Sequence, residues 1–340
     1  MKNQKSQRKM KMKRLTNSSN LFIRKGIVMM NRISYFFILM ILSSNISIAD
    51  ESLNQQLREA ASEGNTAFVS ELVGKGADID APGKYGKTPL MFAAELGKTD
   101  TIAILLSHDA NVNARTKSGS TALTFAAENG HASITAMLVQ LGANVHDRTR
   151  AGWNSLMIAS KNGYDIIVAQ LLEFGADVRS SDRKGNSAMM YAIKEGHPKV
   201  IKTLFQYSDL VAPCLPNHQG VTPMMAAIDN NQQEIFDILL PVSENLKFKD
   251  KYGANALHYA AESGKLSFVK SLINKGNVDI NSQDDDGDSP LIEAVEKGSV
   301  EIVSYLLSKG ADVSLKTTGG KTAKDIATEK GNAEVLKLFE

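Results

Sequence analysis

The chain has 340 residues, of which 43% are hydrophobic and 22% are charged, and its formal net charge is +2 at pH 7. The first 49 residues hold 10 Lys or Arg and no Asp or Glu, so residues 50–340 hold 29 basic against 37 acidic residues, a net charge of −8. An acidic body disfavours binding to nucleic acid, which selects basic surfaces, and the single cysteine, Cys214, excludes an intramolecular disulfide.

The first 49 residues have the features of an export leader. A basic start precedes an apolar run at residues 33–42, and the segment ends with the small residues Ser47 and Ala49. This order is typical of a secretory signal, so we expect cleavage after Ala49 and a mature protein in the periplasm or outside the cell. The rival is an organelle transit peptide, which the compact apolar run disfavours.

Two further points about the leader stay open. The apolar run is shorter than the ~20 residues that span a bilayer, yet a retained run at 33–42 would anchor the protein to a membrane as a tethered scaffold. The long basic stretch before Met29 is unusual for a signal, so we also expect that the true start is Met29 or Met30.

From residue 51 onward one sequence phrase recurs, most completely at residues 253–264. Each copy opens with a glycine, and the steps between opening glycines are 33, 33, 33, 35, 33, 34 and 33 residues. A fixed period of this size predicts a stacked array of one supersecondary unit. The opening glycines are Gly86, Gly119, Gly152, Gly185, Gly220, Gly253, Gly287 and Gly320; they define repeats one to seven and a C-terminal unit.

The first full copy shows why the phrase predicts a helix pair. Thr88 can cap a helix, and Pro89 suits its first position. Ala93 and Ala94 are small enough for successive units to approach closely, and residues 101–106 supply the apolar stripe of a second helix. Neither helix can bury its apolar face alone, so each unit depends on its neighbours.

The phrase resembles the signature of the ankyrin repeat family, Thr-Pro-Leu-His-x-Ala-Ala followed by glycine. The resemblance covers residues 51–340 and implies an all-α helical repeat solenoid with short β-hairpin loops. We expect residues 1–49 to be the leader and residues 50–340 the repeat domain, with an N-terminal cap at 50–82, about seven full repeats at 83–317 and a C-terminal cap at 318–340. Prolines and a lost Gly-Ala pair in repeats four and five predict the weakest stacking between about residues 205 and 250.

We find no signal for catalysis or for a bound group. Residues 282–293 match much of a calcium-loop spacing, but Ser282 stands where the first acidic ligand belongs, and the stretch coincides with a repeat loop. We therefore interpret it as an acidic loop tip with no metal. The sequence contains no nucleophile elbow, phosphate loop or paired CxxC, so we expect no catalytic residue, no cofactor and no small-molecule substrate.

The resemblance implies binding to another protein, because ankyrin arrays hold partners with their loop tips and inner-helix ends. Trp153 is the only tryptophan and directly follows an opening glycine; it is either an interface anchor or a packing residue over a neighbouring loop. The tips are basic with two tyrosines, which favours a partner with an acidic surface, although loop tips are often simply solvated charges. The expected partner-binding residues are Trp153, Tyr85, Arg115, Lys117, Arg148, Arg150, Arg183, Lys184, Lys251 and Tyr252.

Overall fold

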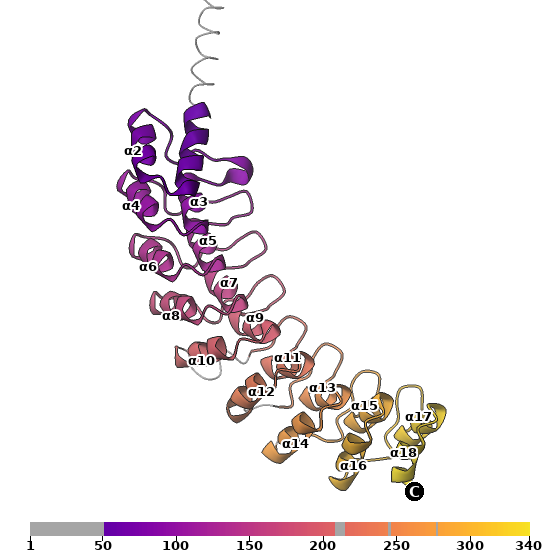
Figure 1. Cartoon of the computed structure of the whole chain (residues 1–340). Coiled ribbons are helices and arrows are strands. Elements are labelled where there is room, and N and C mark those ends of the chain that lie inside the picture. The colour runs from indigo at the N-terminus through magenta and orange to yellow at the C-terminus, as the bar shows by residue number, and fades with distance from the viewer. Residues whose placement is uncertain (1–50, 208–214, 244–245, 277) are drawn as a thin grey trace, which may run out of the picture.

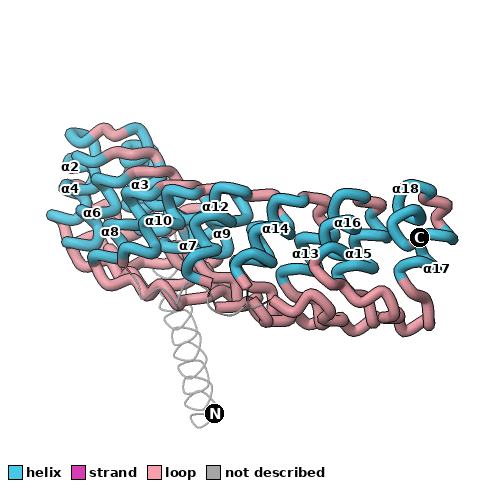
Figure 2. The backbone as a smooth tube through the Cα atoms, turned by 90° about the horizontal axis from the view of Figure 1, so that it is seen from below, coloured by secondary structure: helices cyan, strands magenta, loops and turns pink. Residues whose placement is uncertain are grey.

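The computed structural model describes residues 51–207, 215–243, 246–276 and 278–340. In this part of the chain, helix pairs stack in single file into a curved array, with an inner row of helices beside the loops and an outer row behind it (Figure 1). The loops line one edge of the array along its whole length (Figure 2). The all-α solenoid predicted from the repeat period is confirmed.

The helices alternate between the two rows. The inner row consists of a helix at residues 51–63, α3 (Pro89–Glu95), α5 (Ala122–Glu128), α7 (Ser155–Lys161), α9 (Ala188–Glu195), α11 (Pro223–Asp229), α13 (Ala256–Glu262), α15 (Pro290–Lys297) and α17 (Ala323–Glu329). The outer row consists of α2 (Thr66–Gly74), α4 (Thr99–Ser107), α6 (Ala132–Gln140), α8 (Asp165–Glu173), α10 (Pro198–Gln206), α12 (Gln233–Leu239), α14 (Leu266–Lys275), α16 (Val300–Ser308) and α18 (Ala333–Leu336). Single 3₁₀ turns lie at η1 (Lys84–Gly86), η3 (Leu240–Val242) and η4 (Lys337–Phe339).

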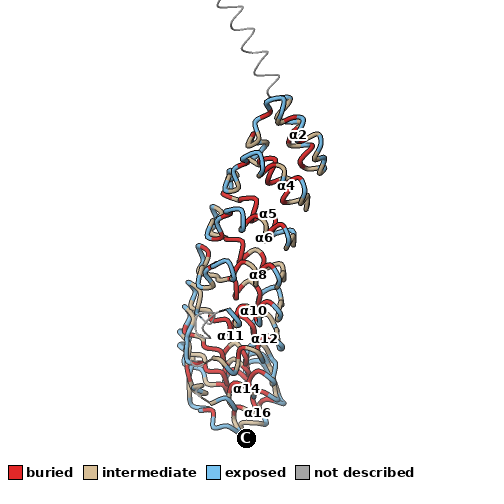
Figure 3. The backbone as a smooth tube through the Cα atoms, turned by 90° about the vertical axis from the view of Figure 1, so that its left-hand side faces the viewer, coloured by how far each residue is buried: buried red, intermediate tan, exposed pale blue. Residues whose placement is uncertain are grey.

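Each inner helix from α3 to α17 begins after a residue whose side chain caps it. In α3, the Thr88 hydroxyl accepts a hydrogen bond from the Met91 backbone N–H at 3.4 Å, and Pro89 occupies the first helical position. Ala93 and Ala94 are fully buried where α3 packs against α5. Buried residues therefore form one band along the array (Figure 3), and every repeat completes the core of its neighbours.

Backbone hydrogen bonds join the tips of neighbouring loops. The Lys117 backbone N–H donates to the Tyr85 carbonyl at 2.9 Å, and equivalent bonds of 2.7–3.1 Å join further neighbouring tips along the array. The opening glycines make this approach possible: Gly185 has φ +80°, and a Cβ there would lie 2.5 Å from the His218 backbone nitrogen. The tips are turns, and the described residues contain two isolated β-bridges, Ser181–Ser187 and Lys316–Thr322, without longer strands.

The irregular stretch predicted at residues 205–250 is visible in part. The outer helix α12 ends at Leu239 and continues as η3 through Pro241, where other repeats have a Gly-Ala turn. Residues 208–214, including Cys214, and residues 244–245 lie outside the described part, so the weak stacking stays a prediction. The leader, with Met29, residues 33–42 and Ala49, also lies outside it. Among the described helices, none combines the length and hydropathy that crossing a membrane requires.

Candidate functional site

Three rows of residues, with one member from each repeat, lie on the inner helices or just before them, and the inner helices and the loops form the concave side of the array (Figure 1). We name them by their distance from each opening glycine. The plus-one row is Lys87, Ser120, Trp153, Asn186, Val221, Ala254, Asp288 and Lys321. The plus-six row is Phe92, Phe125, Ile158, Tyr191, Ala226, Tyr259, Glu293 and Ile326. The plus-nine row is Glu95, Glu128, Lys161, Lys194, Asp229, Glu262, Glu296 and Glu329.

Long plus-one side chains reach over the plus-six side chain of the following repeat. In repeat one, Lys87 Nζ lies 4.2 Å from the ring centroid of Phe125 and 4.7 Å from that of Phe92. In repeat three, the rings of Trp153 and Tyr191 have centroids 4.3 Å apart and are tilted by 45°. Trp153 is thus half-buried against the next repeat while still facing the concave side.

A hollow of about 830 Å³ opens in the middle of the concave face. It lies beside Tyr191, at the point where the next plus-one and plus-six residues, Asn186 and Ala226, are both small. Trp153, Met190 and Val221 add apolar surface to its wall. Its charged lining consists of Lys161, Asp182, Arg183, Lys184, Lys194, Glu195 and Asp229. The space is therefore a recess with an apolar wall, and its border carries four basic and three acidic side chains.

Tyr191 is held in place from the loop side. Its hydroxyl donates to Asp182 Oδ2 at 2.6 Å, and Asp182 Oδ1 accepts the backbone N–H groups of Lys184 and Asn186 at 2.8 Å each. Burial raises the pKa of Tyr191 above its usual value, and the Asp182 carboxylate adds to this shift. The ring therefore stays neutral and fixed, which gives the hollow a preformed aromatic wall.

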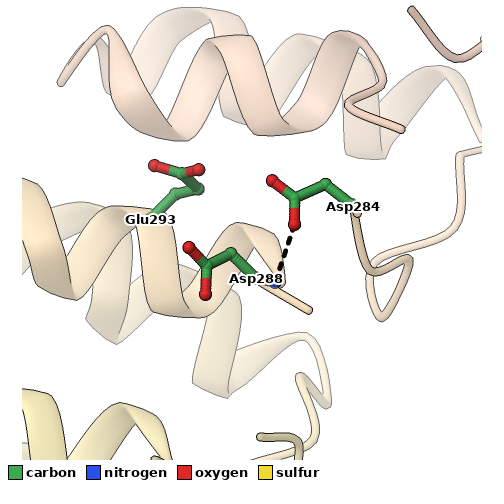
Figure 4. A group of neighbouring side chains, drawn as sticks. All are labelled: Asp284, Asp288 and Glu293. Atoms are coloured by element: carbon green, nitrogen blue, oxygen red, sulfur yellow. Dashed lines mark hydrogen bonds between the residues drawn. The ribbon is translucent and has the colours of Figure 1, made fainter. Parts of the chain in front are cut away.

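Repeat six contains an equivalent tyrosine–aspartate hydrogen bond, but repeat seven has a glutamate in place of the tyrosine. The Tyr259 hydroxyl donates to Asp250 at 2.8 Å, whereas Glu293 stands at the tyrosine position in repeat seven. Asp284, Asp288 and Glu293 point toward one shared space (Figure 4), with carboxylate oxygens within 4.8 Å of one another. This group of described residues has the spacing to hold a cation, and the expectation of no metal stays a prediction.

The acidic group of repeat seven holds protons unusually tightly. Burial, assisted by the charge of Asp284, raises the pKa of Asp288 to about 6. Burial, assisted by the charge of Glu262, raises the pKa of Glu293 to about 7. One oxygen of Asp288 is also buried without a hydrogen-bond partner. Carboxylates that crowd in this way repel each other, and partial protonation relieves that repulsion near neutral pH.

The predicted partner-binding residues lie where expected, on the tips, but two of them also brace the array. Arg115 pairs with Asp147 at 2.9 Å and donates to the Arg148 carbonyl. Arg148 in turn donates to the Ser181 carbonyl at 2.5 Å. Their guanidinium groups are thus engaged with the following tip, which is a structural role in addition to any role in binding.

The other predicted residues are available to a partner. Tyr85 and Tyr252 are 66% and 62% exposed. The side chains of Lys117, Arg150, Arg183, Lys184 and Lys251 are exposed, and Lys251 Nζ lies 4.5 Å from the ring centroid of Tyr252. The structure brings Trp153, Arg183 and Lys184 together at the hollow, whereas Tyr85 and Tyr252 lie on distant tips.

Sequence reasoning did not recognise Lys161, Tyr191, Lys194 and Ala226 as parts of one site. The repeats themselves carry the signal. Written in register, the plus-nine row is acidic at six positions and basic only at Lys161 and Lys194. Ala226 is likewise the smallest member of the plus-six row. The two lysines belong to repeats three and four and Ala226 to repeat five, and the fold places all three around the hollow.

Comparison with known proteins agrees with this architecture. A family model described as ankyrin repeats in three copies matches residues 57–149, 141–213, 210–284 and 264–339. The ankyrin repeat protein YahD of Escherichia coli is 30% identical over 128 residues, which cover 36% of this chain and 64% of that protein. Alpha-latrocrustotoxin-Lt1a of Latrodectus tredecimguttatus is 31% identical over 35% of this chain, and tyrosine-protein kinase Shark of Drosophila melanogaster is 33% identical over 36%. The alignments cover 8% and 13% of those two proteins, so the chain spans less than two thirds of each relative.

Proposed function

The chain belongs to the ankyrin repeat family, whose repeats generally act as non-catalytic protein interaction modules, and we propose that it holds a protein partner along its concave face and loop tips. The hollow at repeats three to five is the observation that supports this most directly. It offers a preformed aromatic wall with basic side chains at its border. The same features favour a partner with an acidic surface. We propose no role for a small-molecule substrate, a cofactor or nucleic acid.

The basic tips extend this surface beyond the hollow. Arg150, Arg183 and Lys184 are exposed, and their side chains make no ion pair within the described part of the chain. Exposed charges of this kind increase association rates and select partners of the opposite charge more than they add affinity. Trp153 provides a rigid aromatic contact area of the kind from which interfaces draw most of their binding energy.

Substitutions on this surface test the proposal. Once a partner is isolated by affinity capture on the full chain and purified, we expect Trp153→Ala to weaken its binding by about 1–3 kcal/mol, and the double variant Arg150→Glu/Lys184→Glu to weaken it comparably. Titration calorimetry measures both, and circular dichroism checks that helical content is unchanged. Lys199→Glu, the same charge change on the outer helix α10, is the matched control. Unaltered affinity in both test variants would remove this surface from the binding site.

We further propose that the protein acts outside the cytoplasm, supported by the basic start, the apolar run at residues 33–42 and the small residues Ser47 and Ala49. The expected mature protein begins at Asp50 and is found in the soluble periplasmic or extracellular fraction. N-terminal sequencing after cell fractionation measures this. A membrane-bound form that keeps residues 33–42 would instead support the tethered scaffold, and a cytoplasmic form with residues 1–28 would exclude both.

A further inference from the structure

The hollow exists because one concave side chain is missing from an otherwise bulky row. The plus-six row carries aromatic or branched side chains in repeats one to four, and Ala226 interrupts it in repeat five. The plus-one residue that would cover this place, Asn186, is short and is held by a hydrogen bond from Asn217 at 3.0 Å. Space therefore remains open between Tyr191 and Val221, within the hollow.

The charge along the concave face changes sign at the same place. The plus-nine row is acidic in repeats one and two, basic at Lys161 and Lys194, and acidic again from Asp229 onward. Lys161 Nζ lies 5.5 Å from the ring centroid of Trp153, and Lys194 is exposed at the end of α9. Arg183 and Lys184 border the hollow from the loop side. Four cations thus face one recess from both sides.

We propose that the hollow binds an extended acidic segment of the partner, with one aromatic or long apolar side chain placed above Ala226 and a flanking carboxylate held between Lys161 and Lys194. This inference rests on the proposed function and names the chemistry that the site selects. Asp229 lines the hollow from repeat five, and Glu195 lines it next to Lys194 at the end of α9, so the acidic residues of the segment lie toward Lys161 on the side of repeat three. Aromatic anchors in such pockets, rimmed by charges, are the usual energetic centre of an interface.

Single-stranded nucleic acid also favours aromatic and basic side chains, but the structure favours a peptide. Asp182, Glu195 and Asp229 line the same hollow, and each would repel a phosphate backbone. The net charge of residues 50–340 is −8, whereas nucleic-acid binders present basic surfaces. A peptide segment can place its carboxylates and its apolar group separately, which matches the mixed lining.

Selection from a random peptide library displayed on phage tests the inference with the full chain as bait. Peptides that bind the wild type are expected to contain an aromatic or long apolar residue flanked by Asp or Glu. Counter-selection on the Ala226→Phe variant should discard them, because the new ring occupies the space above residue 226 in which the apolar side chain of the peptide would lie. Phe92 and Phe125 occupy the same position in repeats one and two, so this variant is expected to keep the fold, which thermal denaturation checks.

A selected peptide then serves as the probe in titration calorimetry. Ala226→Phe and the double variant Lys161→Glu/Lys194→Glu are each expected to weaken it by about tenfold or more, as loss of an anchor pocket or of a charge partner does. Glu95 and Glu128 show that glutamate is accepted at the plus-nine position. Lys199→Glu should change the affinity by less than about twofold. An oligothymidylate of twelve nucleotides should not compete with the peptide.

The outcomes separate this inference from the general function. Peptides that bind Ala226→Phe as tightly as the wild type but lose affinity in Arg150→Glu, a tip residue outside the hollow, would overturn the hollow as the site while keeping the loop tips as a binding surface. Selected peptides without acidic residues, or competition by the oligonucleotide, would overturn the proposed chemistry. No enrichment on the wild type, together with no effect of any concave variant on the captured partner, would overturn both proposals.

Discussion

Replacing Phe236 with alanine is expected to lower the free energy of unfolding by about 3–5 kcal/mol, the usual cost of truncating a buried phenylalanine. Phe236 on α12 and Phe268 on α14 are both fully buried, and their ring centroids lie 4.7 Å apart. They join the outer helices of repeats five and six. Because a solenoid is held by contacts between neighbouring repeats, the lost stability is expected to weaken mainly the interface between repeats five and six.

The unfolding curve should therefore change its shape as well as its midpoint. With the contact between Phe236 and Phe268 lost, repeats one to five and repeats six and seven are expected to unfold in separate steps. Urea denaturation followed by circular dichroism measures the transition, and hydrogen exchange assigns its parts. Phe174→Ala, at a side chain that is 39% exposed, is the matched control and should cost far less. A single transition with an unchanged midpoint would contradict this role of the pair.

Glu293→Tyr is expected to stabilise the C-terminal end of the array and to remove a pH dependence. The folded protein raises the pKa of Asp288 from 3.8 to about 6 and that of Glu293 from 4.5 to about 7. The folded state therefore binds protons more tightly than the unfolded state, so its stability falls as the pH rises from about 4 to 7. A pKa shift of one unit corresponds to about 1.4 kcal/mol per group. Because both groups are partly screened by solvent, we expect the free energy of unfolding to decrease by roughly 2 kcal/mol between pH 5 and 8.

Tyrosine at residue 293 restores the arrangement of repeats four and six, in which Tyr191 and Tyr259 donate to Asp182 and Asp250. Unfolding of the full chain at pH 5 and pH 8, followed by hydrogen exchange at α15 and α16, measures the change. The reverse substitution, Tyr259→Glu, should create a similar pH dependence in repeat six beside Asp250. Equal pH profiles for the wild type and Glu293→Tyr would show that the acidic group does not control this end.

Much of the fold could be predicted because its causes are local and repeated. Thr88, Pro89 and the alanine pair after them set the start and the packing face of an inner helix, and the glycine period predicts the stacking. The repeat period did not predict how closely the tips of neighbouring loops approach each other. The Gly185 conformation matters because the tip of the following repeat lies against it, which is a contact between residues 33 positions apart.

The site was harder to predict than the fold because it depends on register between repeats. Trp153 stood out as the only tryptophan, yet its neighbour Tyr191 lies 38 residues further along the chain. The hollow arises from small side chains, Asn186 and Ala226, and composition gives no signal for a space. The brace from Arg148 to the Ser181 carbonyl likewise depends on the closeness of two tips, so sequence alone could not separate it from an exposed binding group such as Arg150.

The plus-six row differs from the positions that follow it in how much its residues vary between repeats. Within one chain this row accepts Phe92, Tyr191, Ala226 and Glu293, while the adjacent alanine pair stays buried in repeats one, two and six. The plus-six position therefore varies in size and charge between repeats, whereas the positions that follow it keep small buried residues in these three repeats. A substitution at the plus-six position can therefore reshape the concave surface of one repeat while the buried alanine pair beside it is retained.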